Sequence, residues 1–430
     1  MRNTILMIIT VCCFLCYSAG AVFAETTAYI ADYGADELLQ VFDTSDDVTS
    51  LEVGDTPYGV AVTPDGNQVL VTLLESDALV FINTSDFSQI VETLPVGSAP
   101  HGVAVDPKGS YAYVANYDNN TVSQVSLSTR TIVETIDVGE GPWGVAARYD
   151  EENSTPVVYV TNYNDGTVSV IGEDNEITTI NVGDDPIGVA VTPDGNYAYV
   201  ANSEDNSVSI IDTDDESVTD TLYVDDGPWG VAVGAQGDYV YVTNNYSDTV
   251  TVIQTSDNTI YRTFNVGDGP CGVSAPINGM FAYVVNQYDG SISRIDMDDE
   301  SVEDYLTDQT DDAASIGVFI GDTKPSAPSD LEAETQDENT ISLTWTDNSD
   351  DELGFKIERS KKNEDNYVQI ATVSADRTSY ESYNLSSDTT YYYRLRAYKE
   401  ASDSDYSASA TATTDRYTGS IWCFIGAMVQ

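Results

Sequence analysis

The sequence is poor in the residues that build most metal sites, haem attachments and hydrolase active sites. Its 430 residues include one histidine, His101, and five cysteines. A zinc or copper site made of several imidazoles is therefore excluded, and no Cys-x-x-Cys-His segment is present to attach a c-type haem. There is also no Gly-x-Ser-x-Gly segment, the usual setting of an exposed serine nucleophile.

Basic residues are scarce as well. The chain has 16 Lys and Arg against 72 Asp and Glu, for a formal net charge of −56. Between residues 25 and 322 the basic residues are Lys108, Arg130, Arg148, Arg262 and Arg294. Such a negative field repels phosphate backbones and anionic lipid headgroups, so a nucleic-acid partner is excluded. The charge is also explained by the solubility of an exported protein whose self-repulsion is screened by salt.

The N-terminal segment predicts export. Residues 1–24 contain a basic residue, an apolar run and a small residue, Ala24, in the order of a secretory signal. Cleavage after Ala24 would also remove Cys12, Cys13 and Cys16. Only Cys271 and Cys423 would remain, too few for a disulfide framework. We therefore expect a secreted or cell-surface protein with no transmembrane span in the mature chain.

A short motif, Pro-x-Gly-Val, returns along the chain at nearly constant intervals. The glycines of its seven copies are Gly59, Gly102, Gly144, Gly188, Gly230, Gly272 and Gly317. They lie 43, 42, 44, 42, 42 and 45 residues apart, and the last copy lacks the proline. A period of about 40–45 residues with several short β-rich segments is typical of a β-propeller, with one four-stranded blade per repeat. The predicted fold class is all-β, with a seven-bladed propeller.

A second motif supports this prediction and carries a resemblance to a known family. It is a Tyr-Val-Thr-Asn tetrapeptide at Tyr29–Asp32, Val69–Thr72, Tyr113–Asn116, Tyr159–Asn162, Tyr199–Asn202, Tyr241–Asn244 and Tyr283–Asn286, with variations. Together with Pro-x-Gly-Val-Ala-Val it resembles the bacterial YVTN-family β-propellers, which are surface-layer-like repeat proteins. The resemblance covers residues 25–322.

The ends of the repeat region predict how the ring closes. The first repeat begins at a second strand, at Tyr29, and the last ends at a first strand, Ser315–Ile320. We therefore expect a split seventh blade, with three strands from the N-terminal end and one from the C-terminal end. The third repeat is longer than the others, which predicts a projecting loop at 148–155.

The segment that follows resembles a fibronectin type III domain over residues 323–415, after a Pro-rich linker. The matching segments are Ile341–Trp345, Gly354–Arg359 and Leu385–Ala397. The resemblance implies that Trp345 is the core tryptophan and that Tyr391 fills the tyrosine-corner position. Residues 416–430 form an apolar tail too short to span a bilayer, in which Cys423 is a hypothetical anchoring or sorting residue.

The variable residue of Pro-x-Gly-Val offers a candidate ligand site. It is Tyr58, His101, Trp143, Ile187, Trp229, Cys271 and Ile316 in turn. The first strand of each blade lines the central channel of a propeller, so these side chains should form a circle near one mouth. Aromatic rings there stack on sugars, peptides or planar ligands. The predicted ligand-binding residues are Tyr58, His101, Trp143, Trp229 and Cys271, and the alternative is that these side chains only plug the channel or pack blade against blade.

These observations favour an exported, non-enzymatic binding or structural protein whose propeller presents a binding face to a protein or glycan at the cell surface. No catalytic residue, metal site or cofactor is predicted. The turns Asn162–Gly166 and Asp347–Glu352 suggest calcium loops but lack the full ligand pattern, so weak calcium binding is left open. The alternatives are a propeller enzyme of lactonase or lyase type and a surface-layer lattice subunit. The oligomeric state is left open.

Overall fold

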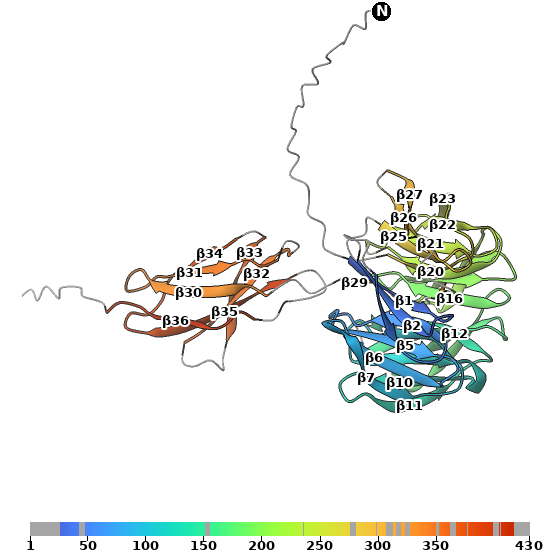
Figure 1. Ribbon diagram of the computed structural model, residues 1–430, viewed down its shortest axis with the longest axis horizontal. Helices are drawn as coiled ribbons and strands as arrows, with labels where there is room; N and C mark the ends of the chain where they lie inside the picture. The colour runs from blue at the N-terminus through green and yellow to red at the C-terminus, as the bar shows by residue number, and fades with distance from the viewer. Residues whose placement is uncertain are drawn as a thin grey trace, which may run out of the picture.

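The structure, a computed structural model, is built from strands in two domains (Figure 1). It describes residues 26–42, 48–150, 155–234, 236–275, 281–297, 299–306, 313–314, 320–322, 327–349, 352–361, 367–375, 377–398, 404 and 406–416. The predicted signal at 1–24, residues 417–430 of the predicted tail, and Cys423 lie outside these residues. Among the residues that are described, no helix is long and apolar enough to cross a bilayer.

Seven sheets form the propeller. Six of them are made of four consecutive strands each. Their strands are β4 (Pro57–Val62), β5 (Gln68–Leu73), β6 (Ala78–Asn83) and β7 (Asp86–Pro95); β8 (Pro100–Val105), β9 (Tyr111–Asn116), β10 (Thr121–Ser126) and β11 (Thr131–Asp137); β12 (Pro142–Asp150), β13 (Thr155–Asn162), β14 (Thr167–Ile171) and β15 (Ile177–Asn181); β16 (Pro186–Val191), β17 (Tyr197–Asn202), β18 (Ser207–Asp212) and β19 (Ser217–Tyr223); β20 (Pro228–Val233), β21 (Tyr239–Asn244), β22 (Thr249–Gln254) and β23 (Thr259–Asn265); and β24 (Pro270–Ser274), β25 (Phe281–Asn286), β26 (Ser291–Asp296) and β27 (Ser301–Leu306). Two short 3₁₀ turns, η1 (Tyr117–Asn119) and η2 (Glu173–Asn175), connect β9 to β10 and β14 to β15.

The seventh sheet closes the ring. It contains β1 (Thr26–Asp32), β2 (Glu37–Phe42) and β3 (Val48–Glu52), and both β28 (Ala313–Ala314) and β29 (Ile320–Asp322) pair with β1. The pairing is antiparallel, with Ala31 opposite Ala314 and Ala28 opposite Ile320. Most of the expected closing strand, residues 315–319, lies outside the described residues. The two ends of the repeat region therefore share one sheet, and the described pairs cover both ends of the inner edge of β1.

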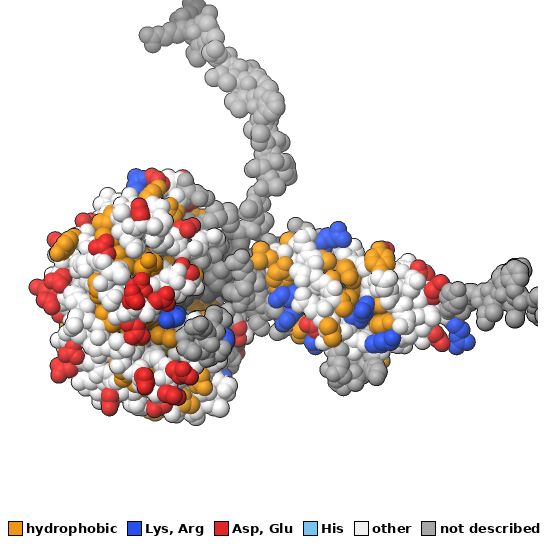
Figure 2. All heavy atoms as spheres, turned by 180° about the vertical axis from the view of Figure 1, so that it is seen from behind, with side chains coloured by type: hydrophobic (Ala, Val, Ile, Leu, Met, Phe, Trp, Pro, Cys, Tyr) orange, Lys and Arg blue, Asp and Glu red, His pale blue; other side chains and the backbone are white. Residues whose placement is uncertain are grey.

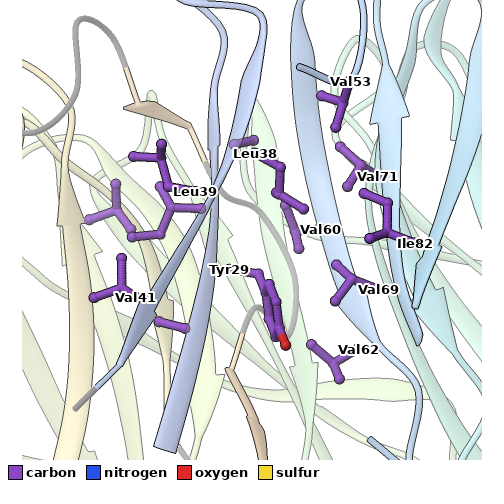
Figure 3. Packing of buried hydrophobic residues seen from close by; sticks show 14 of the residues in the cluster. Tyr29, Leu38, Leu39, Val41, Val53, Val60, Val62, Val69, Val71 and Ile82 are labelled. Atoms are coloured by element: carbon purple, nitrogen blue, oxygen red, sulfur yellow. The ribbon is translucent and has the colours of Figure 1, made fainter. Parts of the chain in front are cut away.

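Burial within a blade explains why its strands differ in composition. In β17 every residue after Tyr197 is buried, because this second strand lies between neighbouring blades. The fourth strand, β19, is mostly exposed and polar, and only its Val218 and Leu222 are partly buried. Around the ring seam, Tyr29 and Leu38 pack with Val60, Val69 and Ile82 of the following blade (Figure 3). The same cluster includes residues of the preceding blade, so the closing sheet is packed on both faces.

Two details of the repeats differ from expectation. In the first repeat Pro57 pairs with Leu73, as Pro100 pairs with Asn116 in the second. The tetrapeptide of that repeat is therefore 70–73, and its prediction at Val69–Thr72 was wrong by one residue. Leucine replaces both the tyrosine and the asparagine there, so nothing in the sequence fixed the alignment.

The extra residues of the third repeat lengthen two strands. Arg148 pairs with Val157, and Asp150 with Thr155, so the β12–β13 hairpin continues past the length of its neighbours. The prediction of a loop over 148–155 was therefore wrong for the described part, and residues 151–154 lie outside it. Residues of high β-propensity, such as Val157 and Val158, favour strand pairing over a loop in this segment.

The second domain is a sandwich of two sheets. One contains β30 (Ser329–Thr335), β31 (Ile341–Thr346) and β34 (Ser379–Ser382), and the other β33 (Val368–Ser374), β32 (Gly354–Ser360), β35 (Thr390–Tyr398) and β36 (Ala410–Thr413). Trp345 is buried and its ring centroid lies 5.5 Å from that of Phe355. The hydroxyl of buried Tyr391 accepts a hydrogen bond from the Ser386 N–H at 2.9 Å. Both residues thus have the roles that the resemblance implied.

Candidate ligand-binding site at the channel mouth

The variable residues of Pro-x-Gly-Val meet at one end of the inner strands. The ring centroids of Tyr58 and His101 are 5.0 Å apart, and those of His101 and Trp143 are 4.3 Å apart. Trp143 in turn lies 6.2 Å from Trp229 in a T-shaped arrangement. Side chains from successive repeats therefore form one aromatic cluster, because each occupies the same place at the start of an inner strand.

The glycine that follows each variable residue allows this convergence. A Cβ at Gly59 would collide with the carbonyl oxygen of His101 in the next blade, and one at Gly144 would collide with that of Ile187. The inner strands thus approach each other more closely than a side chain would permit. This close approach brings the preceding side chains within contact distance around the channel.

Threonine hydroxyls link the same places between blades. Thr72 Oγ1 accepts the Gly59 N–H at 2.8 Å and donates to the His101 carbonyl at 2.6 Å. Thr161 and Thr243 make the equivalent bonds, with donor distances of 2.7 and 3.1 Å to the carbonyls of the next blade. The threonine of the tetrapeptide therefore sets the spacing of neighbouring inner strands at the mouth.

A pocket of about 190 Å³ opens within the cluster. Its lining residues are Tyr33, Thr56, Tyr58, Leu74, Trp143, Trp229, Cys271 and Gln287. The predicted residues Tyr58, Trp143, Trp229 and Cys271 are thus brought together. Sequence reasoning missed Tyr33, Leu74 and Gln287, although each directly follows its repeat's tetrapeptide, a position that the repeat alignment could have singled out.

His101 has a different place from its predicted neighbours. Its side chain is only 7% exposed and packs between Tyr58, Tyr117 and Trp143 without lining the pocket. Nδ1 lies 2.9 Å from the Ala99 carbonyl oxygen. Burial lowers the pKa of His101, so the ring is neutral near pH 7. The cluster therefore contains a packed part as well as a pocket; Ile187 is buried, and Ile316 lies outside the described residues.

The described residues that line the pocket include no Asp, Glu, Lys, Arg or His. Burial raises the pKa of Tyr58, so its phenol keeps its proton at physiological pH. The Trp143 side chain is a hydrogen-bond partner of the Tyr58 phenol, whereas the Nε1 atom of Trp229 is buried without an acceptor among the described residues. A buried N–H without an acceptor costs about 1–3 kcal/mol. The pocket thus offers aromatic surface to a bound molecule, with one unpaired indole N–H buried beside it.

A second pocket lies at the opposite end of the inner strands. It has a volume of about 310 Å³ and is lined by small apolar side chains, including Ala61, Ala104, Ala190 and Ala232. None of its described lining residues is charged, and Ser274 supplies the only side-chain hydroxyl among them. It holds no arrangement of polar groups that would orient a ligand.

The turns that suggested calcium loops have other hydrogen-bond partners. Asn162 Nδ2 donates to Thr167 Oγ1 and to Ser169 Oγ, both at 2.9 Å. Asp165 Oδ2 accepts the Glu140 N–H at 2.6 Å, and Asp347 Oδ1 accepts the Ser349 N–H at 3.1 Å. Within the part of the chain that the structure describes, no group of three or more His, Cys, Asp or Glu is placed to hold a metal ion.

Comparisons with known proteins agree with both domains. Residues 190–277 match the YNCE-like beta-propeller family, and residues 326–413 match the Fibronectin type III domain. A stretch of 99 residues is 35% identical to an alpha-amylase of Niallia circulans. That stretch is 22% of this chain and 7% of the amylase, so the chain spans a small fraction of that relative's length.

Solved structures are similar in fold. A functionally unknown protein from Desulfotomaculum acetoxidans is 18% identical, with a TM-score of 0.59, over 68% of this chain and 99% of its own. A putative 6-phosphogluconolactonase from Bacteroides fragilis is 14% identical, with a TM-score of 0.56, over 69% and 98%. Virginiamycin B lyase from Staphylococcus aureus is 16% identical, with a TM-score of 0.52, over 67% and 90%. At these identities the similarity concerns the fold alone.

The seven sheets, the repeated tetrapeptide and the two family matches lead to one conclusion. The chain consists of a YVTN-type, YNCE-like β-propeller followed by a C-terminal fibronectin type III domain.

Proposed function

We propose that this is an exported binding protein whose propeller holds an uncharged, oxygen-bearing ligand in the pocket at the aromatic mouth. The observation that carries the proposal is one pocket lined by the rings of Tyr58, Trp143 and Trp229, beside which the Trp229 indole N–H is buried without an acceptor among the described residues. The rings would stack on flat or apolar faces of a ligand, and a carbonyl or hydroxyl oxygen would accept the Trp229 N–H after a small shift of the indole.

The charge of the protein supports a neutral ligand. The propeller holds five basic residues between positions 25 and 322 within a chain of net charge −56, which disfavours anions near the mouth. In the predicted extracytoplasmic location, a protein or a glycan would supply such groups. The fibronectin type III domain then serves as a spacer or a second attachment point.

The described lining of the pocket favours binding over catalysis. Its titratable side chains are Tyr33, Tyr58 and Cys271, and burial keeps the Tyr58 phenol protonated. General acid–base catalysis near neutral pH works best with a group whose pKa lies near the working pH. The lyase and lactonase structures share the fold with this chain, and fold by itself does not assign an activity.

The proposal predicts a ligand that quenches tryptophan fluorescence through Trp143 and Trp229. A library of neutral sugars, amides and lactones should yield a ligand whose binding is lost, by about 100-fold or more, in Trp143→Ala/Trp229→Ala. The double variant should melt within a few degrees of the parent, because both indoles are only partly buried. Trp345→Phe, in the other domain, is the matched control and should leave the quenching intact.

Two results would contradict the proposal. If the double variant unfolds with a loss of several kcal/mol, the two tryptophans belong to the packed core and hold no ligand. If a ligand is bound and then chemically converted by the purified protein, the enzyme alternative replaces the binding function.

A further inference from the structure

Five tyrosines surround the aromatic mouth. They are Tyr33, Tyr117, Tyr163, Tyr246 and Tyr288. Each follows the second strand of a different blade by one or two residues, at the turn toward the third strand. Because the blades are equivalent around the ring, these turns all lie at the same end of the propeller. We refer to these five residues as the tyrosine rim.

Three members of the tyrosine rim contact the pocket or its cluster. Tyr33 lines the pocket, and its hydroxyl accepts a hydrogen bond from Gln287 Nε2 at 2.7 Å. The ring centroids of Tyr117 and Tyr163 lie 5.6 and 5.1 Å from that of Trp143. The Tyr163 hydroxyl donates to Asp185 Oδ2 at 2.9 Å, and desolvation, with this bond, raises the pKa of Tyr163 to about 12. This part of the rim is thus continuous with the pocket, and the Tyr163 phenol keeps its proton near neutral pH.

The other two members extend outward into solvent. Tyr246 is 68% exposed and Tyr288 is 63% exposed, the highest exposures among the rim residues. Their rings contact Gly227 and Gly269, the glycines that directly precede the Pro-x-Gly-Val motifs of Trp229 and Cys271. The Tyr288 hydroxyl donates to Asn245 Oδ1 at 3.3 Å. Each ring is therefore held against a glycine while much of its surface stays in water.

The backbone N–H groups of these two tyrosines are already hydrogen-bonded. The Tyr246 N–H donates to the Asp226 carbonyl at 3.2 Å, and the Tyr288 N–H to the Asp268 carbonyl at 3.1 Å. Added-strand recognition of a polypeptide requires unpaired main-chain groups, which these two N–H groups do not supply. The exposed rings therefore favour recognition of a partner by side chains, through ring stacking and single hydrogen bonds.

We propose that the tyrosine rim and the pocket together bind a chain of neutral sugars, with one unit in the pocket and further units on Tyr246 and Tyr288. This inference rests on the proposed function of the pocket. A pocket of about 190 Å³ accommodates about one sugar unit, so a single unit leaves the two outer rings uncovered. Sugar rings present flat C–H faces to aromatic side chains, and their hydroxyls form hydrogen bonds with polar groups at the edge of the rings. An anionic chain is disfavoured by the field of the protein.

The test compares short and long sugars on the full chain. Glucose, N-acetylglucosamine and the malto-, cello- and chito-hexasaccharides are each titrated by tryptophan fluorescence and calorimetry. For one series the hexasaccharide should bind at least about tenfold more tightly than its monosaccharide, because its further units cover two more rings. Tyr246→Ala/Tyr288→Ala should reduce the hexasaccharide affinity to that of the monosaccharide. Tyr383→Ala is the matched control, since Tyr383 is 57% exposed and belongs to the fibronectin type III domain.

The outcomes separate this inference from the proposed function. If the short and long sugars bind with equal affinity, the tyrosine rim does not bind sugar and the pocket proposal stands. The same holds if the hexasaccharide still binds more tightly in the double variant. If no sugar of any series quenches the fluorescence while an amide or lactone does, the sugar class is wrong and the pocket proposal stands. Tighter binding of a neutral peptide than of every sugar also overturns the inference.

Discussion

A single position of the tetrapeptide decides how tightly neighbouring blades are joined. Thr72, Thr161 and Thr243 each join the backbone of two blades, whereas Ala115 and Ala201 occupy the same position in the blades between them. The alternation of Thr and Ala, which looks like neutral variation in the sequence, thus has a physical meaning. Bridged and unbridged blade contacts alternate along this part of the ring.

Removing one bridge should destabilise the propeller by an amount typical of buried hydrogen bonds. In Thr243→Val the Gly230 N–H and the Cys271 carbonyl both lose a partner, at a cost of about 1–3 kcal/mol. Steric strain is a minor factor, because Val285 already occupies the equivalent position in β25 and is buried. The measurement is the midpoint of urea unfolding. Ala201→Ser is a control that adds a hydroxyl where no bridge exists, and equal losses in both variants would refute the bridge.

The residues of the candidate site could be found from the sequence only where they belong to a repeated motif. Tyr58, Trp143, Trp229 and Cys271 share one motif position, so periodicity alone placed them together. Tyr33 and Gln287 follow a different motif and reach the pocket because the turns fold inward. Burial could not be read from the motif, which is why His101 was expected at the ligand surface and lies in the packing instead.

At the scale of the elements, β1 differs from every other second strand. It pairs with β2 from its own repeat and with β28 and β29 from the far end of the repeat region. The repeat phase predicted this arrangement, because the first repeat lacks a first strand and the last lacks the others. The strand boundaries were harder to predict. A longer spacing between motifs is compatible with either a loop or a longer hairpin, and only the pairing of β12 with β13 shows that the strands are extended.

Loss of the closing strand should open the ring. A truncation after residue 322 keeps β28 and β29, whereas a truncation after residue 306 removes them and exposes one edge of β1. We expect the shorter form to lose cooperative unfolding or to melt at least about 10 °C lower, because a sheet edge and its packed face become exposed. The check is thermal unfolding followed by circular dichroism. Identical melting of the two forms would show that the ring does not depend on this strand.

At the scale of the whole molecule, charge divides along the chain. Residues 324–416 contain ten of the 16 Lys and Arg, whereas residues 25–322 contain five. Figure 2 shows acidic side chains scattered over the propeller and basic ones gathered on the fibronectin type III domain. The propeller therefore carries most of the self-repulsion, and neighbouring carboxylates have few cations to offset them.

Salt should consequently stabilise the propeller more than the second domain. Raising NaCl from about 0.01 M to about 0.5 M shortens the screening length from about 30 Å to about 4 Å, which weakens repulsion between carboxylates. We expect the melting temperature of the propeller to rise by several degrees and that of the other domain to change less, as measured by calorimetry. Calcium chloride at equal ionic strength is the control. A much larger rise with calcium would point to specific sites and would contradict screening as the cause.

The hydrogen bond between Gln287 and Tyr33 joins residues 254 apart in the chain. One belongs to the sixth complete blade and the other to the sheet that closes the ring, and both line the pocket. The pocket wall is therefore finished only when the two ends of the repeat region have met, which makes it a late event in folding. A molecule bound there favours the closed ring over any opened form, by mass action. Occupancy of the mouth should thus lengthen the lifetime of the fold and slow its cleavage by proteases, which attack opened forms.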